Sequence, residues 1–299
     1  MNEKDKHSLE AHILEGHSPR ALYGYMRIIN LYLKYQSEEQ AKTAVYSQIT
    51  DYIGVLREQG MHPKTVRTHL YSIKMYYQWL VNSGQRDDHP CRDLYLKDRI
   101  EKSIAVDNLY TRKELEDLLN SYVGRLPLMR RRDTVVLSLL VHQAVTNLEL
   151  IELKTSDIDL QKGTLNLRGC IKTQPRVLPL KPEQIMLFNN YIQYCRPLFL
   201  RRNQNPKQED LEAFILSRTG TKMHPTALSG IFCKPLANGQ KITIQKVRQS
   251  AIAHILKTGK DLRVVQAFTG HKQIGSVEAY RQSGLDELKT AIERLHPLQ

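Results

Sequence analysis

The sequence predicts a mainly α-helical protein of two domains, with a small antiparallel β-sheet in the second domain. Three observations support this fold class. Apolar residues recur at helical steps of three and four through the first 95 residues. Two short apolar segments, 164–167 and 176–180, are joined by a polar hairpin. A stretch of mixed charge and weak periodicity lies between the two halves. We therefore expect a helical domain at 1–95, a linker at 96–107, and a second domain at 108–299 that ends in a helix.

The charge balance favours a polyanionic partner. The 299 residues carry a net charge of +13. Residues 1–104 hold 15 basic and 13 acidic side chains, whereas the remainder holds 29 and 18. Charge alone is equally compatible with an ordinary basic protein, so nucleic acid is an expectation that needs a second observation.

The composition also bears on the compartment. No apolar run approaches the roughly 20 residues of a membrane span, and the first residues do not resemble a signal peptide. The four cysteines are scattered without paired-ligand spacing, which is typical of reduced thiols. We expect a cytoplasmic protein with no membrane partner.

Helices account for the first domain. Ser18-Pro19 is a typical helix start. The clearest periodicity follows Pro63, where an apolar stripe recurs by steps of four and three: Val66, Leu70, Ile73, Tyr77 and Leu80.

Basic residues follow other faces of these helices. Arg67, Tyr71 and Lys74 lie opposite the apolar stripe, with Lys64 near the start of the same helix. Arg20 and Arg27 lie seven residues apart on the helix that begins at Ser18-Pro19. For an isolated helix, a solvated face is the simpler interpretation. Beside a DNA-acting site, these six residues become candidates for phosphate contacts.

The second domain begins with a capping box, Thr111 with Glu114, and continues into a buried helix over Val135–Val141. The two strands follow, and Lys172 lies in the hairpin between them. Residues Phe214-Ile215-Leu216 are expected to form a further short buried strand.

The stretch 242–280 carries the chemistry. Gln245, Arg248 and Gln249 share one face of a helix because they lie at i, i+3 and i+4. A second short helix ends at Gly270, His271 follows directly, and Tyr280 comes nine residues later. An arginine can bind two phosphate oxygens in a fork, a histidine can donate to a third, and a tyrosine can attack phosphorus. Each residue alone more often packs, caps a turn or forms a salt bridge.

This stretch resembles the C-terminal catalytic box of the tyrosine recombinases, the phage-integrase and Xer family. Arg248, Gly270-His271 and Tyr280 fill the matching positions, whereas Gln245 and Gln249 stand where that family usually has histidines. Upstream, Glu149 matches a second box of the family, but Thr146 occupies the position of its first catalytic arginine.

The resemblance implies roles for these residues. Tyr280 would be the nucleophile that forms a 3′-phosphotyrosyl link, Arg248 and His271 would hold the phosphate oxygens, and Lys172 would protonate the leaving 5′-oxygen. Gln245 would be a weak hydrogen-bond donor. No metal and no cofactor would be required.

The resemblance also implies a partner and an assembly. The partner would be double-stranded DNA with an inverted-repeat core site, bound by a monomer that becomes a homotetramer on DNA. The apolar stripe of 283–295 would pack either into a neighbouring protomer or onto its own subunit.

Thr146 leaves two hypotheses open, because threonine carries neither the charge nor the fork of arginine. Either another cation compensates (Arg130, Arg168 and Arg176 are candidates), or the chain is a catalytically silent relative that binds DNA as an accessory or regulatory factor.

Overall fold

The computed structural model describes residues 2–98, 104, 108–122, 126–232 and 242–280. The chain divides into two compact units, Met1–Glu101 and Lys102–Gln299. The break lies inside the segment expected to be a linker, and the domain boundaries proposed from the sequence stay predictions. The expected C-terminal helix over 283–295 lies outside the described residues.

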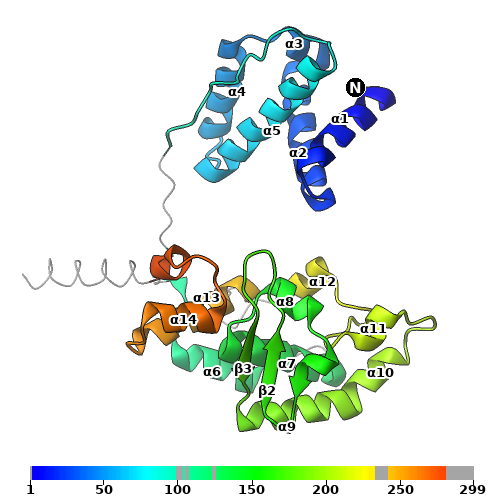
Figure 1. Ribbon diagram of the computed structural model, residues 1–299, viewed down its shortest axis with the longest axis vertical. Helices are drawn as coiled ribbons and strands as arrows, with labels where there is room; N and C mark the ends of the chain where they lie inside the picture. The colour runs from blue at the N-terminus through cyan, green and yellow to red at the C-terminus, as the bar shows by residue number, and fades with distance from the viewer. Residues whose placement is uncertain (1, 99–103, 105–107, 123–125, 233–241, 281–299) are drawn as a thin grey trace, which may run out of the picture. The chain divides into compact units, whose positions relative to one another are not determined.

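The regular secondary structure in the described part of the first unit is entirely helical (Figure 1). Its helices are α1 (Glu3–Gly16), α2 (Pro19–Gln36), α3 (Glu38–Thr43), α4 (Tyr46–Glu58) and α5 (Pro63–Asn82). The apolar stripe predicted for α5 is confirmed, because all five of its members are buried. They pack in one core with residues of α1, α2 and α4.

Buried tyrosines add a polar contact to this core. The hydroxyl groups of Tyr32 and Tyr77 lie 2.6 Å apart, and the Tyr77 hydroxyl also donates to the carbonyl of Ala41 at 3.0 Å. These hydroxyls are satisfied internally, which a buried polar group requires.

The second unit is mixed, as predicted: helices surround a small sheet. Its longer helices are α6 (Arg112–Ser121), α7 (Pro127–Gln143), α9 (Pro182–Asn190), α13 (Ile244–Lys257) and α14 (Leu262–Thr269). Shorter segments are α8 (Asn147–Glu152), the 3₁₀ turn η2 (Thr155–Asp157), the π-helical turn η3 (Tyr191–Cys195), α10 (Arg196–Leu200), α11 (Gln208–Glu212) and α12 (Pro225–Gly230).

The sheet has three antiparallel strands in the order β1 (Ile158–Asp159), β2 (Thr164–Leu167), β3 (Arg176–Pro179). Leu165 pairs with Leu178, and both are buried, so the sheet turns one face to the core. Helix α7 runs through that core and is buried along most of its length, as its apolar run predicts.

The strand expected at Phe214-Ile215-Leu216 is not formed. These residues are buried, but this stretch makes only isolated bridges, Ala213 with Lys154 and Leu216 with Lys222. Burial without a continuous partner strand explains the error, since a short apolar run does not reveal whether it pairs.

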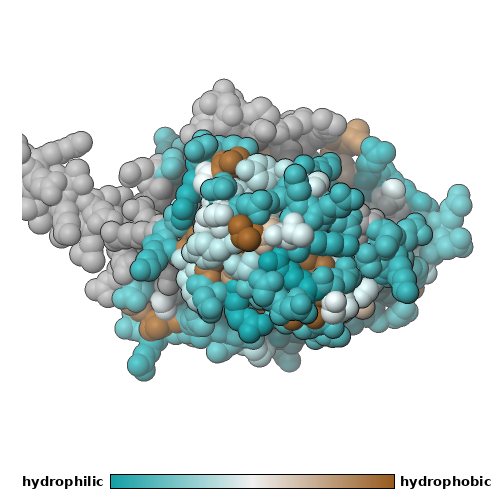
Figure 2. Space-filling view, turned by 90° about the horizontal axis from the view of Figure 1, so that it is seen from above, coloured by the Kyte–Doolittle hydropathy of each residue, from teal (hydrophilic) through white to brown (hydrophobic). Residues whose placement is uncertain are grey.

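The surface is largely hydrophilic on the face that Figure 2 shows, where hydrophobic residues form small separate spots. Such spots are normal for a globular protein, and the described residues on that face form no extended apolar patch. None of the helices that the structure describes combines the length and apolar character needed to cross a membrane.

Candidate active site

Helix α13 positions Arg248. The helix begins after Thr243, whose side chain accepts a hydrogen bond from the backbone of Lys246. Its apolar side, which includes Val247 and Ala251, is buried. The Arg248 Nε donates to the carbonyl of Ala144 at 2.7 Å. Ala144 adopts a left-handed conformation, φ 49°, where α7 ends. The C-terminal end of α7 thus holds the guanidinium that α13 carries.

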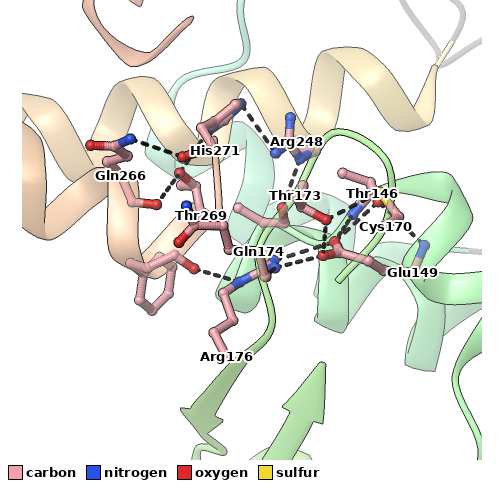
Figure 3. A network of polar contacts seen from close by, with 12 residues as sticks. Thr146, Glu149, Cys170, Thr173, Gln174, Arg176, Arg248, Gln266, Thr269 and His271 are labelled. Atoms are coloured by element: carbon pink, nitrogen blue, oxygen red, sulfur yellow. Dashed lines mark hydrogen bonds and ion pairs between the residues drawn. The ribbon is translucent and has the colours of Figure 1, made fainter. Parts of the chain in front are cut away.

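A turn at Gly270 places His271 next to Arg248 (Figure 3). Gly270 ends α14 with φ 74°, and His271 follows with its Nε2 at 3.3 Å from Nη2 of Arg248. Its Nδ1 lies 2.7 Å from the hydroxyl of Thr269, which itself donates to the carbonyl of Val265. Because an arginine can only donate, Nε2 accepts and Nδ1 carries the proton.

The electrostatics of the site keep His271 neutral. Burial, followed by the charges of Arg248 and Arg176, lowers the pKa of His271 to about 4. Burial also lowers the pKa of the Arg248 guanidinium, against the opposing influence of Tyr280 and Glu149. The site therefore combines a buried cation with a neutral imidazole at pH 7.

Tyr280 joins this group from the same chain. Residues 275–280 are helical, and the Tyr280 side chain is only 7% exposed. Burial raises the pKa of its hydroxyl, whereas the charge of Arg248 and a hydrogen bond with Gln249 act to lower it. The hydroxyl is thus close enough to Arg248 for each to shift the pKa of the other. Both groups therefore belong to one chain.

A buried ion pair lies beside these residues. Glu149 is the third residue of α8, where its carboxylate accepts from the backbone and hydroxyl of Thr146 in a capping box. Nη1 of Arg176 contacts Oε1 of Glu149 at 2.5 Å, and Nη2 contacts Oε2 at 3.2 Å. Burial opposes ionisation of Glu149, but the hydrogen bonds and charge of Arg176, together with hydrogen bonds from Thr146 and Thr173, outweigh it and lower the pKa of Glu149.

The hairpin that contains Lys172 packs on the His271 turn. Thr173 pairs with His271 as an isolated bridge, and the Thr173 hydroxyl donates to Glu149 at 2.7 Å. The backbone N–H of Gln174 donates to the carbonyl of Gly270 at 2.7 Å. Lys172 itself is exposed and directly precedes Thr173. Gln245 is exposed in the first turn of α13, one turn before Gln249.

Most of the candidate DNA contacts of the first unit are exposed, and some of them also contact residues of their own chain. Lys64 and Arg27 are exposed, and the side chain of Arg20 is not described. The Tyr71 hydroxyl lies 3.1 Å from His17 Nε2. Two others contact the segment after α5: Arg67 donates to the carbonyl of Asp98 at 2.5 Å, and Lys74 to that of Arg92 at 2.7 Å.

Within the described part of the chain, no group of three or more His, Cys, Asp and Glu side chains is arranged to hold a metal ion.

The sequence profile of the phage integrase family matches residues 109–286, and that of the phage integrase N-terminal SAM-like domain matches residues 10–84. The chain belongs to the phage integrase family. The resemblance inferred from the catalytic box is thus confirmed, as is the assignment to the tyrosine-type site-specific DNA recombinases.

Curated relatives extend the match over nearly the whole chain. The tyrosine recombinase XerC of Chromobacterium violaceum is 23% identical over 306 residues, covering 99% of this chain and 95% of the relative. The tyrosine recombinase XerD of Listeria innocua is 26% identical over 293 residues, covering 95% and 94%.

Solved structures share the fold. The XerH recombinase bound to its difH substrate aligns with a TM-score of 0.66 at 16% identity, covering 90% of this chain and 78% of that one. The Tn1549 transposon integrase in complex with a circular intermediate DNA aligns with a TM-score of 0.65 at 15% identity, covering 96% and 99%. These likenesses confirm the predicted fold class.

The structure brings together Arg248, His271 and Tyr280 and places Lys172 in the adjoining hairpin. Sequence reasoning missed the part played by Glu149, which it treated only as a motif match, and it could not choose among the three candidate arginines. A signal was present in the capping box, because it predicts that the Glu149 carboxylate lies next to Thr146.

Proposed function

We propose that this recombinase cuts one DNA strand with Tyr280, keeps it as a 3′-phosphotyrosyl link, and rejoins it to a new partner. The proposal rests chiefly on one observation: Tyr280 is buried within electrostatic reach of the Arg248 guanidinium of its own chain. A cation in that place favours loss of the phenolic proton and neutralises the charge of the phosphate.

The remaining residues divide the work of phosphoryl transfer. As the bond between the Tyr280 oxygen and phosphorus forms, the phenolic proton passes to water and the bond to the 5′-oxygen breaks. Lys172 donates a proton to that 5′-oxygen. Arg248 and His271 hold the non-bridging oxygens. Because a bound phosphate adds negative charge next to His271, we expect its pKa to rise on binding, so that Nε2 can donate. Gln245 contributes at most a weak hydrogen bond.

We assign DNA recognition to residues of the first unit. In this proposal Lys64 and Arg27, with Arg20, Arg67, Tyr71 and Lys74, contact the backbone of a double-stranded inverted-repeat site. Each active site cuts one strand, so exchange between two duplexes requires four protomers. We propose a monomer in solution and a homotetramer on DNA, acting in the cytoplasm. Light scattering with and without the selected site tests the assembly.

A nicked suicide substrate tests the chemistry. The full chain first selects its site from duplexes carrying a randomised inverted repeat, and a nicked version of that site traps the covalent intermediate. We expect an adduct stable to denaturing electrophoresis with the unaltered chain, none with Tyr280→Phe, and an undiminished amount with Tyr194→Phe. Tyr194 is a suitable control because it is exposed at 66% on the same unit.

One observation favours a second function. Thr146 cannot supply the charge of an arginine, which is typical of a DNA-binding relative without cleavage activity. If no adduct forms while binding remains tight and weakens steeply with salt, the chain acts as an accessory or regulatory DNA-binding factor.

A further inference from the structure

The site contains the carboxylate of Glu149, but the arginine that the family has nearby in the chain is missing. Glu149 is the third residue of α8 and bonds to Thr146, the position at which the family box has an arginine. A buried carboxylate is costly unless it is paired with a cation. The structure shows which cation has taken that place.

Of the three candidate arginines, Arg176 alone is held by the residues of the site. Arg168 pairs with Asp157 at 2.8 Å, and its side chain is 56% exposed. Arg130 is exposed on α7. The Arg176 side chain is 6% exposed and its partner Glu149 only 1%, and two N–H···O contacts join them in the fork geometry that suits a carboxylate.

A further hydrogen bond fastens Arg176 to the end of α14, next to the His271 turn (Figure 3). Its Nε donates to the carbonyl of Phe268 at 2.8 Å, in the last turn of α14. Its Nη1 lies 2.4 Å from the point where a β-carbon on Gly270 would sit. A cation suits the carbonyl end of a helix, and a residue without a side chain lets the guanidinium approach the backbone that leads to His271.

The net charge of the site is positive, which suits the binding of an anion. Arg176 and Arg248 carry two positive charges, Glu149 carries one negative charge, and His271 is neutral at pH 7 because its pKa is lowered to about 4. Arg176 also acts to lower the pKa of both His271 and Arg248, so it lies within electrostatic reach of each. These four groups leave one positive charge, which a phosphodiester would neutralise.

We propose that Arg176, at the start of β3, supplies a second guanidinium that binds the phosphate together with Arg248. It takes the role of the arginine that the family has at position 146, where this chain has threonine. Glu149 holds it in place, and Gly270 makes room for it. This inference rests on the proposed cleavage function. A purely structural role, in which Arg176 only fastens β3 to α8 and α14, is the alternative that the experiment must separate.

The experiment measures the rate of covalent adduct formation on the nicked, selected site. Loss of a charge-stabilising arginine slows phosphoryl transfer by a factor on the order of 10³ or more. We expect a loss of about that size for Arg176→Gln and a change of less than tenfold for Arg168→Gln, the matched control in a salt bridge of the same sheet region. We expect the double variant Thr146→Arg, Arg176→Gln to recover at least tenfold, because it returns an arginine to Glu149 from the other side.

A second substrate separates charge from structure. A methylphosphonate at the scissile position replaces one non-bridging oxygen by a methyl group and removes the negative charge. We expect it to raise the rate of Arg176→Gln at least tenfold relative to its effect on the unaltered chain, since less charge then needs neutralising. A slow Arg176→Gln variant that the methylphosphonate does not help has lost structure only, and this overturns the inference. So does an Arg176→Gln variant within tenfold of the unaltered rate, while its Tyr280-dependent adduct leaves the proposed function standing. Absence of any adduct from the unaltered chain overturns both.

Discussion

Replacing Gly270 by alanine tests how firmly Arg176 is held. Gly270 has φ 74°, and a β-carbon there would meet Nη1 of Arg176 at 2.4 Å and its Cζ at 2.9 Å. The tip of an arginine normally moves away at little cost. This one is bound to both oxygens of Glu149 and to the carbonyl of Phe268. Alanine therefore has to push the guanidinium out of its ion pair.

The magnitude follows from two contributions. A left-handed conformation costs an L-residue about 1–2 kcal/mol relative to glycine. Breaking a buried ion pair by removing one partner costs about 3–5 kcal/mol, which is an upper limit for a partner that is displaced and not deleted. We expect Gly270→Ala to lower the free energy of unfolding by about 3 kcal/mol or more.

Gly259 offers a matched control. It also follows a helix, α13, with φ 78°, but a β-carbon there would meet nothing within 4 Å. Gly259→Ala should therefore cost only the conformational part, about 1–2 kcal/mol. The difference between the two variants isolates the displacement of Arg176.

Urea unfolding followed by circular dichroism measures both variants. The single tryptophan, Trp79, lies in the first unit, so its fluorescence should show an unchanged transition there. Equal losses of stability for Gly270→Ala and Gly259→Ala would refute the reasoning, because Arg176 would then move aside freely.

Three further results are expected. Burial lowers the pKa of His271 to about 4, below its unfolded value of about 6.5. Its contribution to stability is therefore complete above pH 6.5 and is lost as the pH falls toward 4. The free energy of unfolding should depend less steeply on pH in His271→Gln, and an unchanged slope would contradict the neutral imidazole. Tyr77→Phe removes the hydroxyl that contacts Tyr32 and Ala41 in the buried core, so the Trp79 fluorescence transition should report a loss of about 1–3 kcal/mol; a loss as small as that of a surface variant would mean that the contact adds nothing. Lys64→Ala should reduce the slope of log affinity against log salt by about 1 on the selected DNA; an equal slope would remove Lys64 from the phosphate contacts.

Most helices and strands of the fold could be predicted from local sequence patterns. The stripe on α5 repeats every three to four residues, so its buried side follows from helix geometry alone. The pair β2 and β3 follows from two apolar segments close in sequence, whose hairpin pairing is a short-range property. The failed strand at Phe214–Leu216 shows the limit of this reasoning, because pairing depends on a partner that the segment itself does not specify.

Part of the site could likewise be predicted from the sequence, and part depended on the tertiary structure. The sequence by itself determined that Arg248, His271 and Tyr280 belong together, because their spacing along one short stretch is that of a known catalytic box. Only the tertiary structure decided which cation balances Glu149: Arg176 is 27 residues away on another element, and its contact depends on how β3, α8 and the glycine turn after α14 pack together. Spacing along a chain constrains groups within a helix or turn, whereas the charge balance of a buried site is settled by packing between elements distant in sequence.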